Sequence, residues 1–130
     1  MGMILLDTCL LIDYSRRRPE VVDFVTVVGK SNLYINSVIQ MEFLQGALNA
    51  NDLRQIKRDL QGFALLPIQQ PILDVAVRLL ETYRLTHQAK IPDMIIAGTA
   101  LAYGLEVRTY NMKDFKFITG LLVSDQLTIR

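Results

Sequence analysis

The sequence predicts an α/β fold of three layers, in which helices cover both faces of a central parallel sheet of about five strands. Short apolar segments typical of buried strands alternate along the chain with longer segments of helical periodicity. This alternation favours parallel strands, because helical connections cross over one face of such a sheet. With 130 residues, of which 51% are hydrophobic and 21% charged, we expect one domain over residues 1–130 with its own core.

Apolar runs and helical periodicity divide the first half of the chain into two strands and four helices. Pro19 is tolerated at a first helical position, and Gly29 fits a helix stop. Asn36 or Ser37 caps the third helix. The predicted elements, in order, are a strand at residues 3–6, helices at about 8–15 and 19–28, a strand at 33–35, a helix to about 48, and a helix from 51 or 52 onward.

The second half is expected to hold a strand at 64–68, a helix at 71–86, a loop at 87–91, a helix from 92 to Gly104, and a strand at 106–109. Gly120–Val123 and Leu127–Ile129 compete for a fifth strand. The helix at 71–86 presents a difficulty. It is ~24 Å long at ~1.5 Å per residue, whereas the loop of five residues that follows it spans at most ~18 Å. This helix must therefore tilt or break early.

Acidic and amide side chains occur where such a sheet would bring them together. Asp7 directly follows the first strand, and Glu42 lies in the helix after the second. Asn111 and Asp114 follow the fourth strand. Asp93 begins a helix that runs straight into the fourth strand and must pack antiparallel to it. Ligands bind beyond the carboxyl ends of parallel strands, so we expect all of these residues to meet at one edge.

A carboxylate in an apolar segment is costly to desolvate unless a partner or a cation compensates it. Three of these acidic segments are otherwise strongly apolar, which indicates a divalent-metal site and hence an enzyme. Each residue alone also has an ordinary structural interpretation. Asp7 could cap a helix, Glu42 could lie at a solvent boundary, and Asn and Asp favour turns. At Asp93 the helix macrodipole stabilises an anion by roughly 0.3–1 kcal/mol, and we expect it to lower the pKa of this carboxyl.

The order and spacing of these segments resemble those of PIN-domain ribonucleases, of the type found as toxins in VapBC-like toxin–antitoxin pairs. The resemblance covers nearly the whole chain, and the segments that carry it are ILLDTCLLIDY, INSVIQMEFLQGA, IPDMIIAGTALAYG, and TYNMKDF followed by ITGL. It implies catalytic and metal-binding roles for Asp7, Glu42, Asp93 and Asp114, supported by Ser37, Thr109 and Asn111. It also implies a Mg²⁺ or Mn²⁺ site, cleavage of RNA, a homodimer and a small antitoxin partner.

Two positions depart from the family pattern. Cys9 stands where Asn or Ser is common, and Ile39 stands where Thr or Ser is common. Both departures remove a polar side chain from the surroundings of the acids. They leave open an alternative, a catalytically silent PIN-like module that binds RNA or protein.

Bulk composition constrains the partners. The formal net charge of +1 gives no argument for nucleic acid, so any RNA-binding surface must be local. The candidate cations are Arg16, Arg17, Arg18, Arg54, Lys57 and Arg58. A single cysteine suits a reducing cytoplasm, and no apolar run approaches the ~20 residues that span a bilayer. A mean hydropathy of +0.26 favours exposed apolar surface and a homodimer.

Two other carboxylate-based folds fit the sequence less well. A phospho-acceptor receiver domain places two acids after its first strand and an acceptor Asp after its third, whereas the third strand here ends in Pro67 and Ile68. A phosphatase of the haloacid dehalogenase type needs a second Asp two residues after the first, where Cys9 stands. His87, the only histidine, is expected in a loop away from the acids and offers no general base.

Overall fold

A computed structural model describes residues 3–128 of the chain. Its centre is a five-stranded sheet in the order β3-β2-β1-β4-β5, and each neighbouring pair of strands is parallel. The predicted parallel sheet is thus confirmed. The strands are β1 (Ile4–Leu6), β2 (Leu33–Asn36), β3 (Ala64–Leu66), β4 (Glu106–Arg108) and β5 (Leu122–Ser124).

The fifth strand overlaps the first of its two candidate segments. β5 pairs with β4 through Leu122 and Val123. In the competing segment, Leu127 lies beyond the strand and Ile129 lies outside the described residues.

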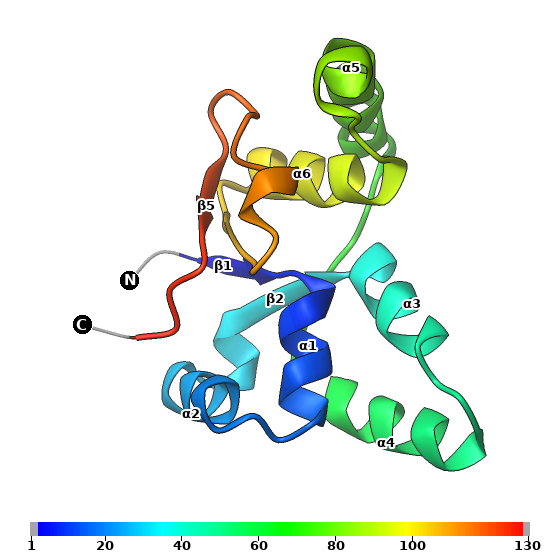
Figure 1. Cartoon of the computed structure of the whole chain (residues 1–130), viewed down its shortest axis with the longest axis vertical. Helices are drawn as coiled ribbons and strands as arrows, with labels where there is room; N and C mark the ends of the chain where they lie inside the picture. Colours follow the sequence, from blue (N-terminus) through cyan, green and yellow to red (C-terminus); the bar gives the residue numbers. More distant parts are fainter. Residues whose placement is uncertain (1–2, 129–130) are drawn as a thin grey trace.

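Six α-helices surround the sheet: α1 (Thr8–Ser15), α2 (Pro19–Val28), α3 (Ser37–Gln45), α4 (Ala50–Leu60), α5 (Gln70–His87) and α6 (Ile91–Tyr103). Two short 3₁₀ turns, η1 (Lys30–Asn32) and η2 (Met112–Asp114), precede β2 and follow β4. Figure 1 shows α6 and α5 on one side of the sheet and α1, α2 and α4 on the other. The three-layer arrangement is therefore confirmed. Across residues 3–128, none of these helices has the length and apolar character needed to cross a membrane.

The strand order explains why the helices divide in this way. The chain steps from β1 to β2 to β3 in one direction and then returns across the sheet to β4. Because crossover connections between parallel strands are right-handed, a reversal of direction moves the connecting helices to the opposite face. Consequently α1 to α4 share one face, and α5 and α6 cover the other (Figure 1).

Side-chain caps fix the first residues of α3 and α4, which the sequence had located only to within one or two residues. The Asn36 side chain accepts a hydrogen bond from the Ile39 backbone N–H at 2.9 Å, so Asn36 rather than Ser37 caps α3. Helix α3 ends at Gln45, earlier than expected. The backbone N–H groups of Gly46 and Ala47 bond to carbonyl oxygens three residues back, as in a turn. The Asn49 side chain caps α4, which therefore begins before the predicted start at residue 51 or 52.

Helix α5 stays continuous for 18 residues and does not break. It packs on the outer side of α6 instead of lying on the sheet (Figure 1). Gly98 of α6 permits this close crossing, since a Cβ there would lie 3.0 Å from the Ile72 carbonyl oxygen. His87 belongs to the helix, and the left-handed backbone of Gln88 ends it. A short loop therefore suffices to reach α6.

The core lies on both faces of the sheet. All three residues of β1 are buried, as is Val107 of β4. Leu10 and Leu11 of α1 and Ile96 and Ala97 of α6 pack from opposite sides. Fully burying a Leu or Ile side chain contributes roughly 1.5–3 kcal/mol. Burial of β1 and β4 thus fixes the positions of the residues that directly follow these strands.

Candidate active site

The site lies where the sheet changes its direction of connection. β1 and β4 are neighbours, but the chain leaves β1 towards β2 and leaves β4 towards β5, on opposite sides. Leu6 of β1 is paired with Arg108 of β4. Asp7 and Thr109 are therefore the first residues beyond the carboxyl ends of the two strands. This is the crevice in which α/β sheets bind ligands.

Asp7 accepts hydrogen bonds from residues that follow β1 and β4. The Thr109 hydroxyl donates to Oδ2 of Asp7 at 2.8 Å, and the Thr8 backbone N–H donates to Oδ1 at 2.8 Å. Thr109 in turn accepts the backbone N–H of Asn111 at 2.9 Å. Asp7 is only 6% exposed and also caps α1. The structural interpretation of Asp7 as a helix cap is confirmed. In this position the carboxylate of Asp7 lies at the crevice.

Three more acids reach the same region from separate elements. Glu42 lies on α3 and accepts the Thr8 hydroxyl at 2.9 Å. Asp93 is in the first turn of α6, and Asp114 is the last residue of η2. Burial, followed by the charges of Asp114, Asp7 and Glu42 in that order, raises the pKa of Asp93 to about 7, and the charge of Lys90 opposes this rise. The four acids are thus close enough to repel one another.

The expectation that the helix macrodipole lowers the pKa of Asp93 is wrong. The helix N-terminus favours an anion by only about 0.3–1 kcal/mol. Burial and three neighbouring carboxylates oppose it, and together they prevail. The pKa values of Asp7 and Glu42 are also raised, mainly by burial. Ionising these three carboxyls is therefore costlier in the folded chain than in the unfolded one.

The chemistry of these groups fits a hard divalent cation. Carboxylate and hydroxyl oxygens are the ligands that Mg²⁺ and Mn²⁺ favour. Within residues 3–128, however, no three acidic, histidine or cysteine side chains are already close enough to surround one ion. Thr8 and Thr109 hold Glu42 and Asp7 by hydrogen bonds.

Comparison with known proteins identifies the family. The family model described as PIN domain matches residues 4–118. The chain belongs to the PIN-domain family. It is 28% identical to Ribonuclease VapC10 of Mycobacterium tuberculosis over 92% of this chain and 90% of that protein, and 29% identical to Ribonuclease VapC1 of Rickettsia felis over 95% of each.

Solved structures agree with this assignment. One chain of a toxin–antitoxin complex from Klebsiella pneumoniae superposes with a TM-score of 0.75 at 31% identity, covering 92% of this PIN domain and 95% of that chain. A chain of DNA-bound VapBC from Salmonella typhimurium superposes with a TM-score of 0.83 at 23% identity, covering 95% and 98%. The second likeness shows the fold alone. The resemblance read from the sequence is thereby confirmed.

The predicted supporting residues of this PIN domain differ in burial and in their contacts with the acidic cluster. Thr109 is fully buried against Asp7, whereas Asn111 is exposed and joins the cluster through its backbone N–H. Ser37 is half-buried at the start of α3. A buried pair that the sequence reading missed lies next to it, in which the Asn36 amide donates to the Thr99 hydroxyl at 2.9 Å. A threonine in the apolar run of α6 was the available signal.

The two departures from the family pattern occupy different environments. Cys9 is half-buried, with its Sγ 3.9 Å from Oδ2 of Asp7 and 3.6 Å from Oγ1 of Thr109. Burial raises the pKa of its thiol, which keeps it protonated and able to donate to Asp7. Ile39 is fully buried in the core. The thiol thus contacts the acidic cluster, while the isoleucine fills space behind it.

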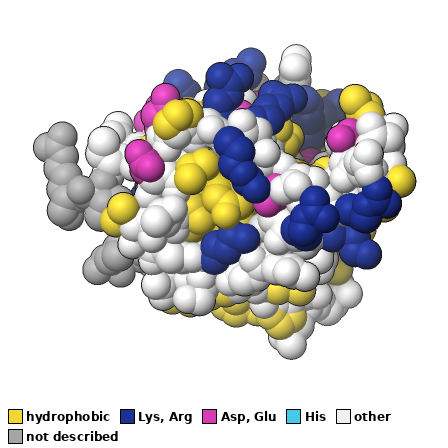
Figure 2. Space-filling view, turned by 90° about the horizontal axis from the view of Figure 1, so that it is seen from below, with side chains coloured by type: hydrophobic (Ala, Val, Ile, Leu, Met, Phe, Trp, Pro, Cys, Tyr) yellow, Lys and Arg dark blue, Asp and Glu magenta, His cyan; other side chains and the backbone are white. Residues whose placement is uncertain are grey.

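The predicted cations form an exposed surface on the far side of the sheet from α6. Figure 2 shows Lys and Arg side chains gathered around an apolar patch on the lower face, the side that carries α2 and α4 in Figure 1. Arg54 and Arg58 bond to Asn51 and Gln55 of their own helix, and Lys57 is exposed beside them. Their predicted contact with RNA stays a prediction.

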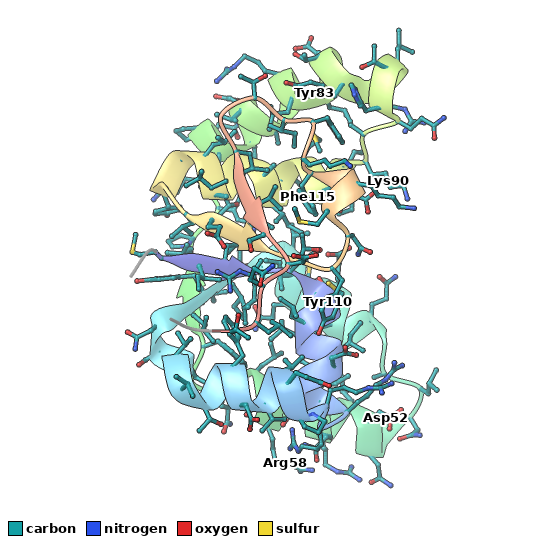
Figure 3. The ribbon with its side chains drawn as sticks, turned by 60° about the vertical axis from the view of Figure 1, so that its left-hand side comes forward. Asp52, Arg58, Tyr83, Lys90, Tyr110 and Phe115 are labelled. Atoms are coloured by element: carbon teal, nitrogen blue, oxygen red, sulfur yellow. The ribbon has the colours of Figure 1, made fainter. Side chains whose placement is uncertain are left out.

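Lys90 is a cation at the site that the sequence reading did not select. It is the residue directly before α6, is exposed, and acts electrostatically on Asp93. Figure 3 shows it on the loop between α5 and α6, with Tyr110 on the loop after β4 beside α1. Its signal in the sequence was its position three residues before Asp93, within one helical turn.

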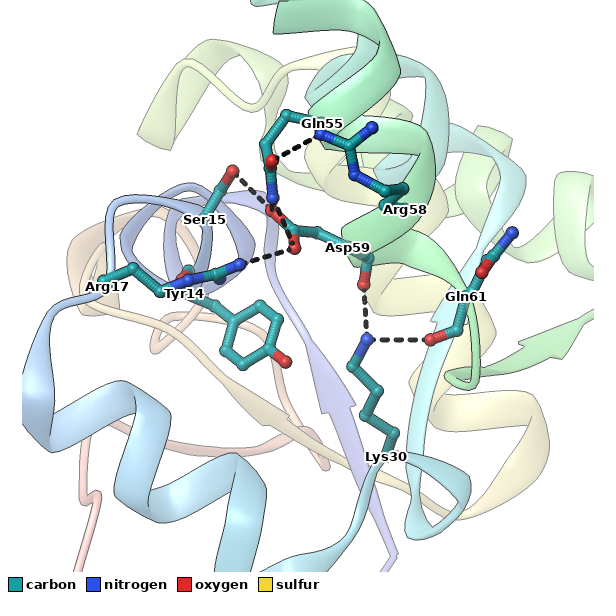
Figure 4. A network of polar contacts seen from close by, with 8 residues as sticks. All are labelled: Tyr14, Ser15, Arg17, Lys30, Gln55, Arg58, Asp59 and Gln61. Carbon is teal, nitrogen blue, oxygen red and sulfur yellow. Dashed lines mark hydrogen bonds and ion pairs between the residues drawn. The ribbon is translucent and has the colours of Figure 1, made fainter.

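Arg17 has a structural partner. It bonds to the buried carboxylate of Asp59 at 3.2 Å, which also accepts the Ser15 hydroxyl at 2.7 Å and the Gln55 amide (Figure 4). Lys30 donates to the backbone carbonyl oxygens of Asp59 and Gln61. This network joins the end of α1 to α4. Arg17 is thus occupied on one side, although its side chain remains 55% exposed.

Arg16 faces a groove instead. The groove has a volume of about 380 Å³ and lies between α1, α3 and α4. Its lining is mixed, with Ile12, Phe43, Leu48 and Ile56 among the apolar residues and Ser15, Arg16, Asp52 and Gln55 among the polar ones. Phe43, which directly follows Glu42 in the chain, lines one side of this groove.

Proposed function

We propose that this PIN domain is a metal-dependent endoribonuclease that cleaves RNA phosphodiester bonds, and that it acts as the toxin of a toxin–antitoxin pair. One observation carries the catalytic part of the proposal. Asp93 lies near three acids from separate segments, and burial together with the charges of Asp114, Asp7 and Glu42 raises its pKa to about 7. Such mutual repulsion at a sheet switch point is what a divalent cation would relieve.

In this proposal Asp7, Glu42, Asp93 and Asp114 hold Mg²⁺ or Mn²⁺. The bound ion would stabilise charge on the scissile phosphate and activate water. Thr109 fixes the orientation of Asp7, and Thr8 fixes that of Glu42. No histidine is available nearby, because His87 stacks on Phe117 at a centroid distance of 4.3 Å.

Substrate charge would be met by cations outside the cluster. Lys90 acts electrostatically on Asp93 and suits a phosphate next to the scissile one. Arg16 and Arg18 at the end of α1 would extend this track. Each phosphate contact contributes to a steep fall of RNA affinity with salt.

The names of the relatives support the biological role. Both curated relatives are ribonucleases, and the neighbour at 31% identity comes from a toxin–antitoxin complex. We place a segment of a small antitoxin in the groove beside Arg16, where apolar and polar lining residues suit an amphipathic segment. We further propose one domain over residues 1–130, a homodimer and a cytoplasmic location.

Cleavage of a mixed RNA pool tests the enzyme. We expect cleavage with Mg²⁺ or Mn²⁺, none with chelator, and none with Asp93→Asn in either ion. Asp74→Asn, an exposed carboxylate change on α5, is the matched control and should cleave normally. Cleavage by Asp93→Asn at the wild-type rate would remove Asp93 from the site.

A silent RNA- or protein-binding module is the second candidate, and Cys9 is the observation that favours it. The thiol lies against Asp7 and Thr109, where the family commonly has a more polar side chain. A silent module would bind the RNA pool without cutting it in either ion. Cys9→Asn would then be expected to restore cleavage.

A further inference from the structure

Tyr110 is an exposed aromatic residue at the rim of the acidic cluster. It lies between Thr109 and Asn111 on the loop after β4, and 42% of the residue is open to solvent. Figure 3 shows it beside α1, on the loop that follows β4. None of the roles assigned above to the acids or the cations uses this ring.

The backbone at Tyr110 is held from both sides. Its N–H donates to Sγ of Cys9 at 3.5 Å. The preceding residue, Thr109, donates to Asp7, and the following residue, Asn111, donates its N–H back to Thr109. The backbone at Tyr110 is therefore tied to the position of Asp7. A ligand that contacts the ring need not first order this loop.

The surroundings of the ring disfavour a phosphate and favour an uncharged partner. Asp13, Cys9 and Glu20 lie close enough to affect Tyr110, and partial burial with these neighbours raises the pKa of its hydroxyl to about 12. The hydroxyl is therefore neutral at ordinary pH and leans towards acidic residues of α1 and α2. A phosphate would be repelled there, whereas a nucleobase carries no charge and presents an aromatic face.

We infer that Tyr110 stacks against an unpaired base of the RNA substrate, next to the phosphate at the acidic cluster. The inference rests on the proposed function. A base in a duplex is already stacked and paired, so this contact selects single-stranded RNA. Lys90, on the loop before α6, would meet the backbone of the same strand.

The test compares cleavage of a labelled single-stranded oligoribonucleotide and of its duplex by the wild type, Tyr110→Phe and Tyr110→Ala. We expect Tyr110→Phe to retain kcat/KM within about twofold, because it keeps the ring. Tyr110→Ala should lose roughly 5- to 100-fold, mostly through KM, as expected for one lost stacking contact. Tyr103→Ala, whose hydroxyl contacts Pro67 away from Asp93, is the control. Unfolding curves of each variant exclude loss of fold.

The outcomes separate the two proposals. If the wild type cleaves and Tyr110→Ala matches it in KM, stacking is refuted and the nuclease stands. If Tyr110→Ala instead changes the oligomeric state in sedimentation without a change in KM, the ring belongs to a protein interface. If the wild type cleaves no RNA, the nuclease fails. Quenching of a 2-aminopurine RNA by wild type and Tyr110→Phe, but not by Tyr110→Ala, would then still support stacking, and equal quenching would refute it.

Discussion

Replacing Asp93 by asparagine should stabilise the protein in the absence of metal while abolishing its response to metal. Asp93 is a partly buried carboxylate repelled by Asp114, Asp7 and Glu42, and its pKa rises from 3.8 to about 7. Asparagine has nearly the same shape but no charge. The substitution therefore removes the repulsion at little cost in packing.

The magnitude follows from the pKa. Each pKa unit corresponds to about 1.4 kcal/mol, so the full rise corresponds to roughly 4 kcal/mol once Asp93 is ionised. Solvent relaxation around a partly exposed group, and the lost interaction with the helix N-terminus of about 0.3–1 kcal/mol, reduce the gain. We expect Asp93→Asn to raise the free energy of unfolding by about 1–3 kcal/mol at pH 8.

The sign of the pH dependence is fixed by the direction of the shift. The folded-state pKa of Asp93 lies above its unfolded value, so protonation favours the folded state. The stability contributed by Asp93 is complete below pH 3.8 and is lost as the pH rises through about 7. The advantage of Asp93→Asn should therefore shrink from pH 8 to pH 5.

Urea unfolding followed by circular dichroism at pH 5 to 8, with chelator, measures this effect. Asp74→Asn on α5 is the control and should match the wild type at each pH. Added Mg²⁺ or Mn²⁺ should then stabilise the wild type and leave Asp93→Asn unchanged. A variant that is less stable than the wild type at pH 8, or one with the same pH profile, would refute the electrostatic reasoning.

Five further substitutions test the supporting structure by denaturant unfolding. Thr109→Val keeps the volume but removes the hydroxyl that donates to Asp7, and should cost about 1–3 kcal/mol and weaken metal-induced stabilisation. Asp59→Ala removes a buried carboxylate that accepts from Ser15, Arg17 and Gln55, and should cost roughly 2–4 kcal/mol. Arg17→Ala, at the exposed end of the ion pair, should cost less than about 1 kcal/mol. Equal costs would contradict this assignment. Gly98→Ala brings a Cβ to 3.0 Å from a backbone oxygen of α5 and should cost about 1–3 kcal/mol; Gly46→Ala, at φ −74°, should be nearly neutral.

Much of the fold was predictable because its signals are local. Apolar runs marked the strands, and Gly29 and Gly104 marked helix ends, where the structure has positive φ values. The convergence of Asp7, Glu42, Asp93 and Asp114 followed from strand order and polarity alone, since the carboxyl ends of parallel strands share one edge.

The remaining features depend on contacts between distant segments. The Asn36–Thr99 pair and the Arg17–Asp59 pair join residues 63 and 42 positions apart, and no local pattern announces such partners. The path of α5 over α6 depends on which helix face meets Gly98. These are properties of packing, which the sequence expresses only through the folded chain.

The sequence by itself determined which side chains gather, because alternation of strand and helix places them at one sheet edge. Only the tertiary structure decided the pKa values of these side chains and which residues surround them. Burial and neighbouring charge act across space, so they reversed the local effect of the helix on the pKa of Asp93. The same packing left Tyr110 exposed next to Thr109, which holds Asp7, and periodicity could not assign this position.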